Sequence, residues 1–273
     1  MDVIALLGAG TMGGAIGRRL LATGQRLTVW NRTPARAGPL VTAGARAATT
    51  PAEAVRDADV VITMLTDATA VREVLGAAAT ALRPGTHLIE MSTIGPAAVP
   101  ELATLLPVGV PLVDAPVAGG AAAAEAGRLT VLAGGDEAAV DRVAPVLDLL
   151  GTVRRCGGPG RGAALKLVLN TGLVTAITAV ADALAVADAV GVARRTALDA
   201  LAAGPLGSAV PRATTTDAAF AVALAAKDAR LALDALGGAP APVLRAATAA
   251  LAAAPDPHLD IAALTGHPDK EHP

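Results

Sequence analysis

Short apolar runs alternate with helix-like stretches through roughly the first 160 residues. The runs Val3–Leu7 and Arg26–Trp30 have the length of buried strands, and apolar residues recur at helical intervals between them. Further strand-like runs follow at residues 59–65, 87–92, 110–117, 129–133 and 152–155. Strands that alternate with helices in this way predict an α/β fold whose doubly wound, mostly parallel sheet occupies a Rossmann domain over residues 1–162.

The pattern changes after a glycine-rich break at residues 157–162. Residues 163–191 show no strand signal and predict one long helix, and because this helix is hydrophobic almost all round we expect it to be buried rather than amphipathic. Shorter helices are predicted at 194–203, 217–236 and 242–254. The sequence therefore predicts an all-helical domain over residues 163–264 and a polar, disordered tail over residues 265–273.

Composition excludes several classes of protein. Hydrophobic residues make up 53% of the chain but aromatic residues only 1%, so the core must be built from Ala, Val and Leu. The formal net charge of −2 shows no basic excess of the kind that binds nucleic acid. The single cysteine, Cys156, excludes an internal disulfide and a cysteine-rich metal site, and no metal is expected.

Targeting and membrane segments are not expected either. The chain opens on a strand without a basic signal-peptide region. Asp, Arg and Gly break the Ala-rich stretches before they reach the roughly 18 residues of a membrane span. We therefore predict a cytoplasmic protein with a small-molecule substrate and with no nucleic-acid or membrane partner.

The segment VIALLGAGTMGG carries glycines in G-x-G-x-x-G spacing between the first strand and the first helix. Gly8 allows the tight turn, Gly10 lets the backbone approach a pyrophosphate, and Gly13 lets the helix pack against the strand. The helix then directs its free N–H groups and positive dipole end at the phosphates. Empty strand–helix turns can show the same spacing, but the strand before it and the helix after it favour a dinucleotide site. The predicted cofactor contacts of this loop are Gly8, Gly10, Thr11, Met12 and Gly13.

The second strand ends at Asn31, Arg32 and Thr33, where many dinucleotide-binding proteins carry an acid for the ribose 2′-hydroxyl. A carboxylate there would repel a 2′-phosphate, whereas the Arg32 guanidinium would pair with it and Thr33 would add a hydroxyl donor. The alternative is an ordinary solvated arginine after a strand. We therefore expect these three residues to bind the cofactor, with NADP(H) preferred and NAD(H) possible.

Lys166 and Asn170 lie four residues apart near the start of the long predicted helix and therefore share one of its faces. Burial among apolar neighbours lowers the pKa of a lysine, which suits proton transfer near neutral pH. The alternative is a surface lysine whose stem lies along a leucine stripe.

Several motifs together make the chain similar to the β-hydroxyacid dehydrogenases, the group of 3-hydroxyisobutyrate dehydrogenase and of the tartronate semialdehyde and glyoxylate/succinic semialdehyde reductases. The resemblance covers residues 3 to about 264. Besides the glycine loop it rests on EMSTIGP, DAPVAGG followed by AEAGRLT, GRGAALKLVLN, and AAFAVALAAKDARLAL. Several ordered motifs at compatible spacing are far more specific than any one of them.

The resemblance implies hydride transfer between a nicotinamide and a small β-hydroxyacid or its semialdehyde or keto acid. It makes Lys166 the catalytic acid/base and gives Asn170 the role of holding the substrate or the lysine. It brings Lys227 to the cofactor, although Lys227 and Asp228 can also be read as an exposed ion pair. The remaining implied contacts are Ser92, Gly119 and Gly120 with the substrate, and Met64, Leu65 and Thr93 with the cofactor.

One departure from the family pattern leaves other functions open. The family usually reads D-x-P-V-S-G-G, where the serine donates to the substrate carboxylate, but this chain has Ala118 at that position. The related imine reductases are therefore the alternative, although they usually carry Asp or Tyr where this chain has Lys166. A cofactor-binding scaffold without activity is a third possibility. The apolar helices of the second half predict a homodimer or homotetramer.

Overall fold

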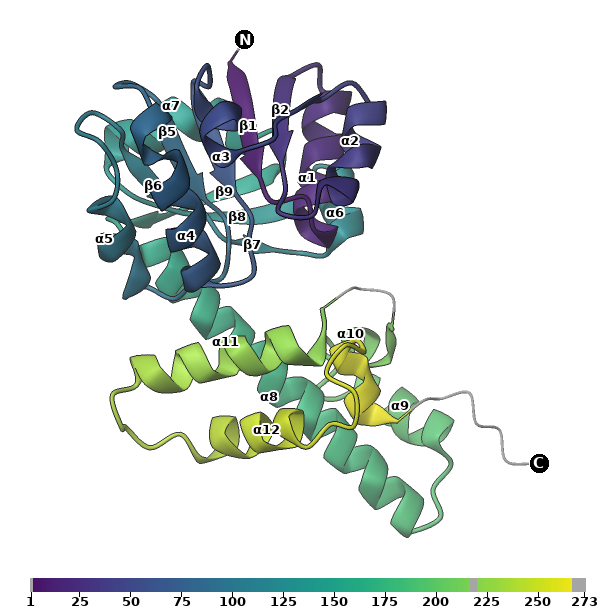
Figure 1. The fold of residues 1–273 in the computed structure, drawn as a ribbon. Coiled ribbons are helices and arrows are strands. Elements are labelled where there is room, and N and C mark those ends of the chain that lie inside the picture. The colour runs from purple at the N-terminus through teal and green to yellow at the C-terminus, as the bar shows by residue number, and fades with distance from the viewer. Residues whose placement is uncertain (1, 217–219, 267–273) are drawn as a thin grey trace. The chain divides into compact units, whose positions relative to one another are not determined.

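The computed structural model describes residues 2–216 and 220–266, in two compact units, Met1–Lys166 and Leu167–Pro273. The first unit is an α/β sandwich of one sheet between two helical layers (Figure 1). Its strands are β1 (Val3–Leu7), β2 (Arg26–Trp30), β3 (Arg46–Ala47), β4 (Val60–Thr63), β5 (His87–Glu90), β6 (Leu112–Asp114), β7 (Val117–Ala118), β8 (Leu129–Gly134) and β9 (Gly151–Gly157). Its helices are α1 (Thr11–Ala22), η1 (Pro34–Ala37), α2 (Gly38–Thr42), α3 (Pro51–Val55), α4 (Ala68–Ala78), η2 (Ala79–Ala81), α5 (Ala98–Ala103), α6 (Ala121–Glu125) and α7 (Glu137–Leu147).

The sheet has the strand order β3-β2-β1-β4-β5-β6-β8-β7, with β9 paired to β8. Every pair from β3 to β6 is parallel, whereas β8 runs antiparallel to β6 and β7, which confirms the mostly parallel sheet. The chain moves outward from β1 in both directions, so the strand order reverses between β1 and β4. In such sheets ligands bind outside the carboxyl ends of the strands at this reversal.

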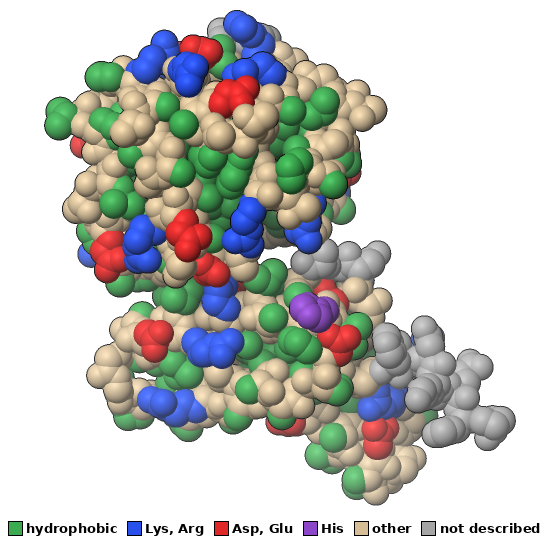
Figure 2. Space-filling view, viewed as in Figure 1, with side chains coloured by type: hydrophobic (Ala, Val, Ile, Leu, Met, Phe, Trp, Pro, Cys, Tyr) green, Lys and Arg blue, Asp and Glu red, His purple; other side chains and the backbone are tan. Residues whose placement is uncertain are grey.

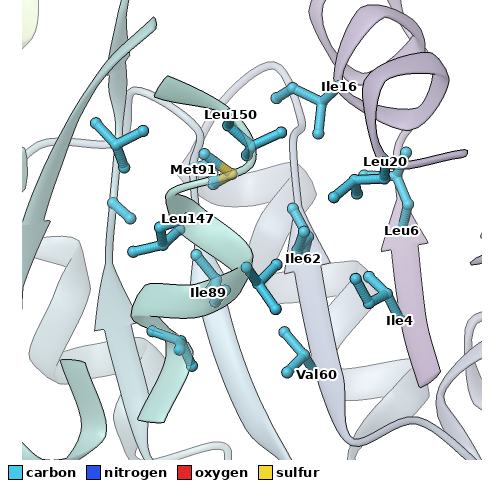
Figure 3. Packing of buried hydrophobic residues seen from close by; sticks show 14 of the residues in the cluster. Ile4, Leu6, Ile16, Leu20, Val60, Ile62, Ile89, Met91, Leu147 and Leu150 are labelled. Carbon is cyan, nitrogen blue, oxygen red and sulfur yellow. The ribbon is translucent and has the colours of Figure 1, made fainter. Parts of the chain in front are cut away.

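Alternating strand residues supply two separate cores, as expected for a parallel sheet covered on both faces. Ile4 and Leu6 of β1 face α1, whereas Ala5 and Leu7 face the opposite layer of α3, α4 and α5. Figure 3 shows the first core, in which side chains of β1, β4 and β5 meet those of α1 and α7. Its residues are aliphatic or Met, so close packing replaces aromatic bulk. In Figure 1, α3 and α4 lie in front of the strands.

The second unit is helical, and its helices are α8 (Arg161–Ala189), which begins in the first unit, α9 (Arg194–Ala202), α10 (Val210–Thr214), α11 (Val222–Ala235), α12 (Pro242–Ala252) and η3 (Ile261–Thr265). Val174, Ile177, Val180 and Leu184 of α8 recur at helical spacing and pack against α10, α11 and α12. No pattern in the sequence indicated α10 or η3.

Four expectations about this half need correction. The long helix starts at Arg161, so the predicted boundary after residue 162 falls inside its first turn. The helix predicted from residue 217 begins at Val222; residues 217–219 lie outside the described residues. The predicted tail starts too early, because Thr265 is buried and its hydroxyl donates to the Ala213 carbonyl at 3.0 Å. Residues 267–273 of that tail lie outside the described residues.

The fourth correction concerns the burial of α8. Only one face of the helix is covered: Val168 is 65% exposed and Val186 61%. By length and composition alone, α8 would also pass for a membrane span, contrary to the expectation that no apolar run is long enough. A core helix of a folded domain can be equally long and apolar. In α8, one third of the most apolar 18-residue stretch is buried. Figure 2 shows hydrophobic side chains exposed on the surface of both units.

Candidate active site

The glycine loop between β1 and α1 has two positions that admit only glycine. Gly8 has a φ of +110°, and a Cβ there would lie 2.3 Å from the Met64 carbonyl oxygen. A Cβ at Gly13 would lie 2.1 Å from the Gly8 carbonyl oxygen. The first contact brings the loop against the end of β4, and the second brings α1 against the loop. The loop is therefore held tightly at the point where the strand order reverses.

Gly10 has the opposite environment, because a Cβ there would meet nothing within 4 Å. The space beside it is an open hollow lined by backbone and by two arginines, namely Ala9, Gly10, Thr11, Gly14, Arg18, Arg36, Pro39 and Leu40. Packing within the protein therefore does not require glycine at this position, and the backbone is open to approach from outside. The N-terminal N–H groups of α1 and the Arg36 guanidinium make the hollow suitable for a pyrophosphate, whereas the Arg18 guanidinium donates to Glu125 Oε1 at 2.6 Å. The residues present therefore fit a dinucleotide.

Asn31 has a role that the sequence did not reveal. Its Oδ1 accepts from the Ala9 N–H at 2.9 Å, and its Nδ2 donates to the Thr33 carbonyl at 2.9 Å. The amide thus ties the end of β2 to the glycine loop. Arg32 and Thr33 are exposed beyond it, and Arg36 returns to the hollow through the η1 turn that begins at Pro34. Sequence analysis missed Arg18 and Arg36, because only the helix and the turn bring them beside Gly10.

The register aligns the last residues of four strands in one row at the carboxyl edge of the sheet. Leu7 of β1 pairs with Thr63 of β4, Thr63 with Glu90 of β5, and Glu90 with Asp114 of β6. The three polar members of this row are at most 1% exposed. Thr63 and Glu90 were not singled out from the sequence, although a polar residue that closes an apolar strand is a usable signal.

Glu90 fixes the loop that carries Ser92. The Thr63 hydroxyl donates to Glu90 Oε2, and the Ser92 N–H donates to Glu90 Oε1 at 2.6 Å. The Ser92 hydroxyl in turn accepts from the Leu65 N–H at 2.8 Å. The loops after β4 and β5 are therefore locked together, with Ser92 buried and Met64, Leu65 and Thr93 half-buried at the same edge. A buried network of this kind holds neighbouring groups in one arrangement.

Asp114 anchors the start of α8. Its Oδ1 accepts from the Gly160 N–H and its Oδ2 from the Ala163 N–H, both at 2.7 Å. A Cβ at Gly162 would lie 2.0 Å from the Leu132 carbonyl oxygen, so the first turn of α8 can pack directly on the sheet. Burial raises the pKa of Asp114 to about 6, while the N–H donors of Ala163 and Gly160 act in the opposite direction. Lys166, half-buried, follows one turn later on α8.

The Ala118–Gly120 segment is shaped by packing as well as by any ligand. Gly119 has a φ of +122°, and a Cβ there would lie 2.8 Å from Leu129 Cδ2. Gly120 precedes α6, and Ala118 pairs with Thr130 of β8. The fold would therefore require Gly119 even without a substrate.

The other predicted site residues lie in the second unit. Asn170 of α8 and Asp228 of α11 are 4% and 3% exposed, and Asn170 Nδ2 donates to Asp228 Oδ2 at 2.5 Å. Lys227 Nζ lies 2.8 Å from the other oxygen, Asp228 Oδ1. The Lys227–Asp228 pair is thus not the exposed charge pair considered from the sequence. Within residues 2–216 and 220–266 no three His, Cys, Asp or Glu side chains gather as metal ligands.

Comparison with known proteins decides the family. The family described as "NAD binding domain of 6-phosphogluconate dehydrogenase" matches residues 3–158, and that described as "NAD-binding of NADP-dependent 3-hydroxyisobutyrate dehydrogenase" matches residues 160–264. A probable 3-hydroxyisobutyrate dehydrogenase of Mycobacterium bovis is 34% identical over 262 residues, which cover 89% of each chain. The chain belongs to the β-hydroxyacid dehydrogenase family.

Solved structures agree with this assignment. The 3-hydroxyisobutyrate dehydrogenase of Mycobacterium tuberculosis, solved with L-serine, is 31% identical and superimposes with a TM-score of 0.85 over 97% of this chain and 98% of that one. A reductive aminase from Aspergillus terreus, in complex with NADPH and ethyl levulinate, is 25% identical. It superimposes with a TM-score of 0.67 over 97% of this chain and 98% of that one. As a β-hydroxyacid dehydrogenase family member, the protein is an NAD(P)-dependent oxidoreductase that binds NADP(H).

Proposed function

We propose that the protein transfers a hydride between a nicotinamide and a small β-hydroxyacid or its semialdehyde or keto acid, with Lys166 as proton donor and acceptor. The observation that carries the proposal is the anchoring of α8. Asp114, at the carboxyl edge of the sheet, fixes the first turn of the helix, and Lys166 follows one turn later. A half-buried lysine is thereby held near the edge at which this class of sheet binds dinucleotides.

Different residues would hold different parts of the cofactor. Gly8, Gly10, Thr11, Met12 and Gly13 suit the pyrophosphate. Arg32 and Thr33, positioned by Asn31, suit a 2′-phosphate, while Met64, Leu65, Thr93 and Lys227 are proposed for the remaining cofactor contacts. When bound, the nicotinamide supplies or accepts the hydride.

The substrate requires a proton partner and an anion site. In the reducing direction the Lys166 ammonium donates a proton to the carbonyl oxygen, and in the oxidising direction the neutral amine accepts the hydroxyl proton. Ser92 and the Gly119 and Gly120 N–H groups are proposed for the substrate carboxylate, since Ala118 offers no hydroxyl. Asn170 is proposed to hold the substrate or the lysine.

Turnover by Lys166 variants tests the proposal. A panel of glyoxylate, succinic semialdehyde, methylmalonate semialdehyde, tartronate semialdehyde and cyclic imines is first assayed with NADPH and NADH. For the best substrate, Lys166→Ala should lower kcat by roughly 10²–10⁴-fold while leaving the NADPH dissociation constant nearly unchanged. Lys166→Arg should not restore activity, because a guanidinium does not readily release its proton. A folded Lys166→Ala protein that keeps more than about a tenth of wild-type turnover would contradict the catalytic assignment.

Imine reduction is the second candidate, and Ala118 favours it because the usual carboxylate donor is missing. The reductive aminase similarity supports the same alternative. Turnover of the cyclic imines that exceeds turnover of every aldehyde in the panel would establish it. Tight NADPH binding without turnover of any member of the panel would instead indicate a cofactor-binding scaffold.

We infer further that the protein forms a homodimer or homotetramer through its helical unit. The exposed valines of α8 support this assembly, because an apolar helix face is stabilised when a partner covers it. The cytoplasmic location proposed from the sequence is tested by cell fractionation.

A further inference from the structure

Asn170 and Asp228 form a buried contact between two helices that are far apart in the chain. They are 58 residues apart, on α8 and α11, and both side chains lie in the interior of the second unit. The interior of the second unit is built mainly from Ala, Val, Leu and Ile, so a buried polar pair there is costly unless each group is satisfied. The contact is therefore a specific feature of the site and not a by-product of packing.

The chemistry of the pair fixes which way the amide points. The Lys227 ammonium forms an ion pair with the Asp228 carboxylate, 2.8 Å from its Oδ1. A carboxylate can only accept hydrogen bonds, so the atom of Asn170 that faces it at 2.5 Å must be the amide nitrogen. The amide oxygen, Oδ1, is then turned away from Asp228 and acts only as an acceptor.

We propose that Asp228 is a positioning residue that fixes the Asn170 amide with its oxygen presented as the acceptor for a hydroxyl or ammonium donor in the reaction. This inference rests on the proposed function, in which both the substrate hydroxyl and the Lys166 ammonium are such donors. Lys227 contributes through its ion pair with Asp228 Oδ1, which keeps the carboxylate in place. Without Asp228 the amide is free to present its NH₂ group, a donor, in the same direction.

The substitution Asp228→Asn should produce that inversion. Lys227 attracts the oxygen of the new amide, which leaves the NH₂ group of residue 228 facing Asn170. Asn170 then turns its own oxygen inward and its NH₂ outward. We expect kcat/KM for the hydroxyacid or aldehyde to fall about 10- to 100-fold, the size of a lost charged hydrogen bond, while the NADPH dissociation constant stays within about twofold.

The exchanged pair, Asn170→Asp with Asp228→Asn, should restore the arrangement. The NH₂ group of residue 228 then donates to one oxygen of the carboxylate at position 170, and the other oxygen remains an outward acceptor. Asn170→Asp alone places two carboxylates against each other and should be as damaging as Asp228→Asn. We expect the turnover of the double variant to lie within about fivefold of wild type and above that of either single variant, which is the signature of an interacting pair in a double-mutant cycle.

Asp260 provides a matched control within the same unit. It is a buried carboxylate that accepts from Arg212 at 2.8 Å and from the Phe220 N–H at 2.9 Å, but it has no bond to Asn170. Asp260→Asn should lower the midpoint of thermal unfolding and leave kcat and KM unchanged. A merely structural role for Asp228 would make its variant behave in the same way.

The experiment combines steady-state kinetics with NADPH, thermal unfolding, and ¹⁵N NMR of side-chain amides. The Asn170 NH₂ signal, assigned by its loss in Asn170→Asp, should have one proton shifted downfield in the wild type and should move in Asp228→Asn. Wild-type kinetics in Asp228→Asn, or an unchanged Asn170 signal, would overturn the inference. The NMR result does not depend on turnover, whereas an inert wild type or an active Lys166→Ala protein would contradict only the proposed function.

Discussion

At the scale of single residues, two glycines of one loop serve different purposes. Gly13 is glycine because the Gly8 carbonyl oxygen lies 2.1 Å from where its Cβ would be, whereas Gly10 faces open space. The G-x-G-x-x-G spacing does not distinguish these roles. Packing requires one glycine, and access for a bound phosphate explains the other.

Alanine at each of the two positions should therefore have opposite effects. Gly13→Ala should lower the free energy of unfolding by at least about 1–3 kcal/mol, because backbone atoms must move. Gly10→Ala, at a φ of −69°, should leave stability within about 1 kcal/mol of wild type and weaken NADPH binding on the order of tenfold. Urea unfolding and fluorescence titration with NADPH measure the two effects. Equal loss of stability in both variants would contradict the distinction.

Arg32 is the residue on which cofactor preference depends. Removal of its guanidinium by Arg32→Ala should weaken NADPH binding by about 1.5–3 kcal/mol, the value of a charged hydrogen bond to phosphate, and leave NADH binding almost unchanged. Arg26, exposed at the opposite end of β2, is the matched control, and Arg26→Ala should change neither. The measurement is the dissociation constant of each variant for NADPH and for NADH. If Arg32→Ala weakens binding of both nucleotides equally, Arg32 does not set the cofactor preference.

At the scale of elements, the feature that positions the candidate catalytic lysine is the junction of β6 with α8. Asp114 closes the strand and also accepts the free N–H groups at the start of the helix. The raised pKa of Asp114, caused by burial, means that the folded protein binds this proton more tightly than the unfolded chain does. The contribution of Asp114 to stability is therefore greatest below pH 4 and is lost as the pH rises through about 6.

The variant Asp114→Asn should not show this loss, because an amide does not titrate. Relative to the variant, the wild type should lose up to about 3 kcal/mol of unfolding free energy between about pH 4 and pH 7. This is the free energy that corresponds to a rise in the pKa of Asp114 from 3.8 to about 6. Urea unfolding of both proteins at pH 4.5, 5.5, 6.5 and 7.5 gives the difference. If the wild type instead becomes more stable relative to the variant as the pH rises, the backbone N–H donors lower the pKa of Asp114 by more than burial raises it.

At the scale of the whole molecule, the helical unit presents apolar side chains that its own residues do not cover. The proposed assembly predicts light-scattering masses of two or four times the 26.6 kDa chain at micromolar concentration. Val186→Asp, on the exposed face of α8, should shift the mass toward the monomer, because a charge would be buried in the interface. Val108→Asp, at a 96% exposed position in the first unit, should have no effect. A monomeric wild type would contradict the assembly.

The fold class and the main site motifs could be predicted because their signals are local. Apolar runs in Val3–Leu7 and Arg26–Trp30 gave the strands, since a strand buried on both faces must be apolar throughout. The glycine spacing indicated the phosphate loop. Lys166 drew attention as a cation among apolar residues in the first part of α8, whereas its catalytic role came from the family resemblance and stays a prediction. Short elements such as α10 and η3 left no periodic pattern long enough to detect.

The tertiary structure decided which residues meet. Thr63 and Glu90 meet only because the strand register pairs them. Arg36 reaches the hollow beside Gly10 only through the η1 turn. Asp114 lies at a strand end, and only the packing of α8 on the sheet makes its carboxylate the acceptor for the first turn of that helix. The contact of Asn170 with Asp228 joins residues 58 positions apart, which no local pattern encodes. The sequence by itself determined the elements and the types of chemistry that they carry, whereas long-range packing determined the partner and the orientation of each polar group.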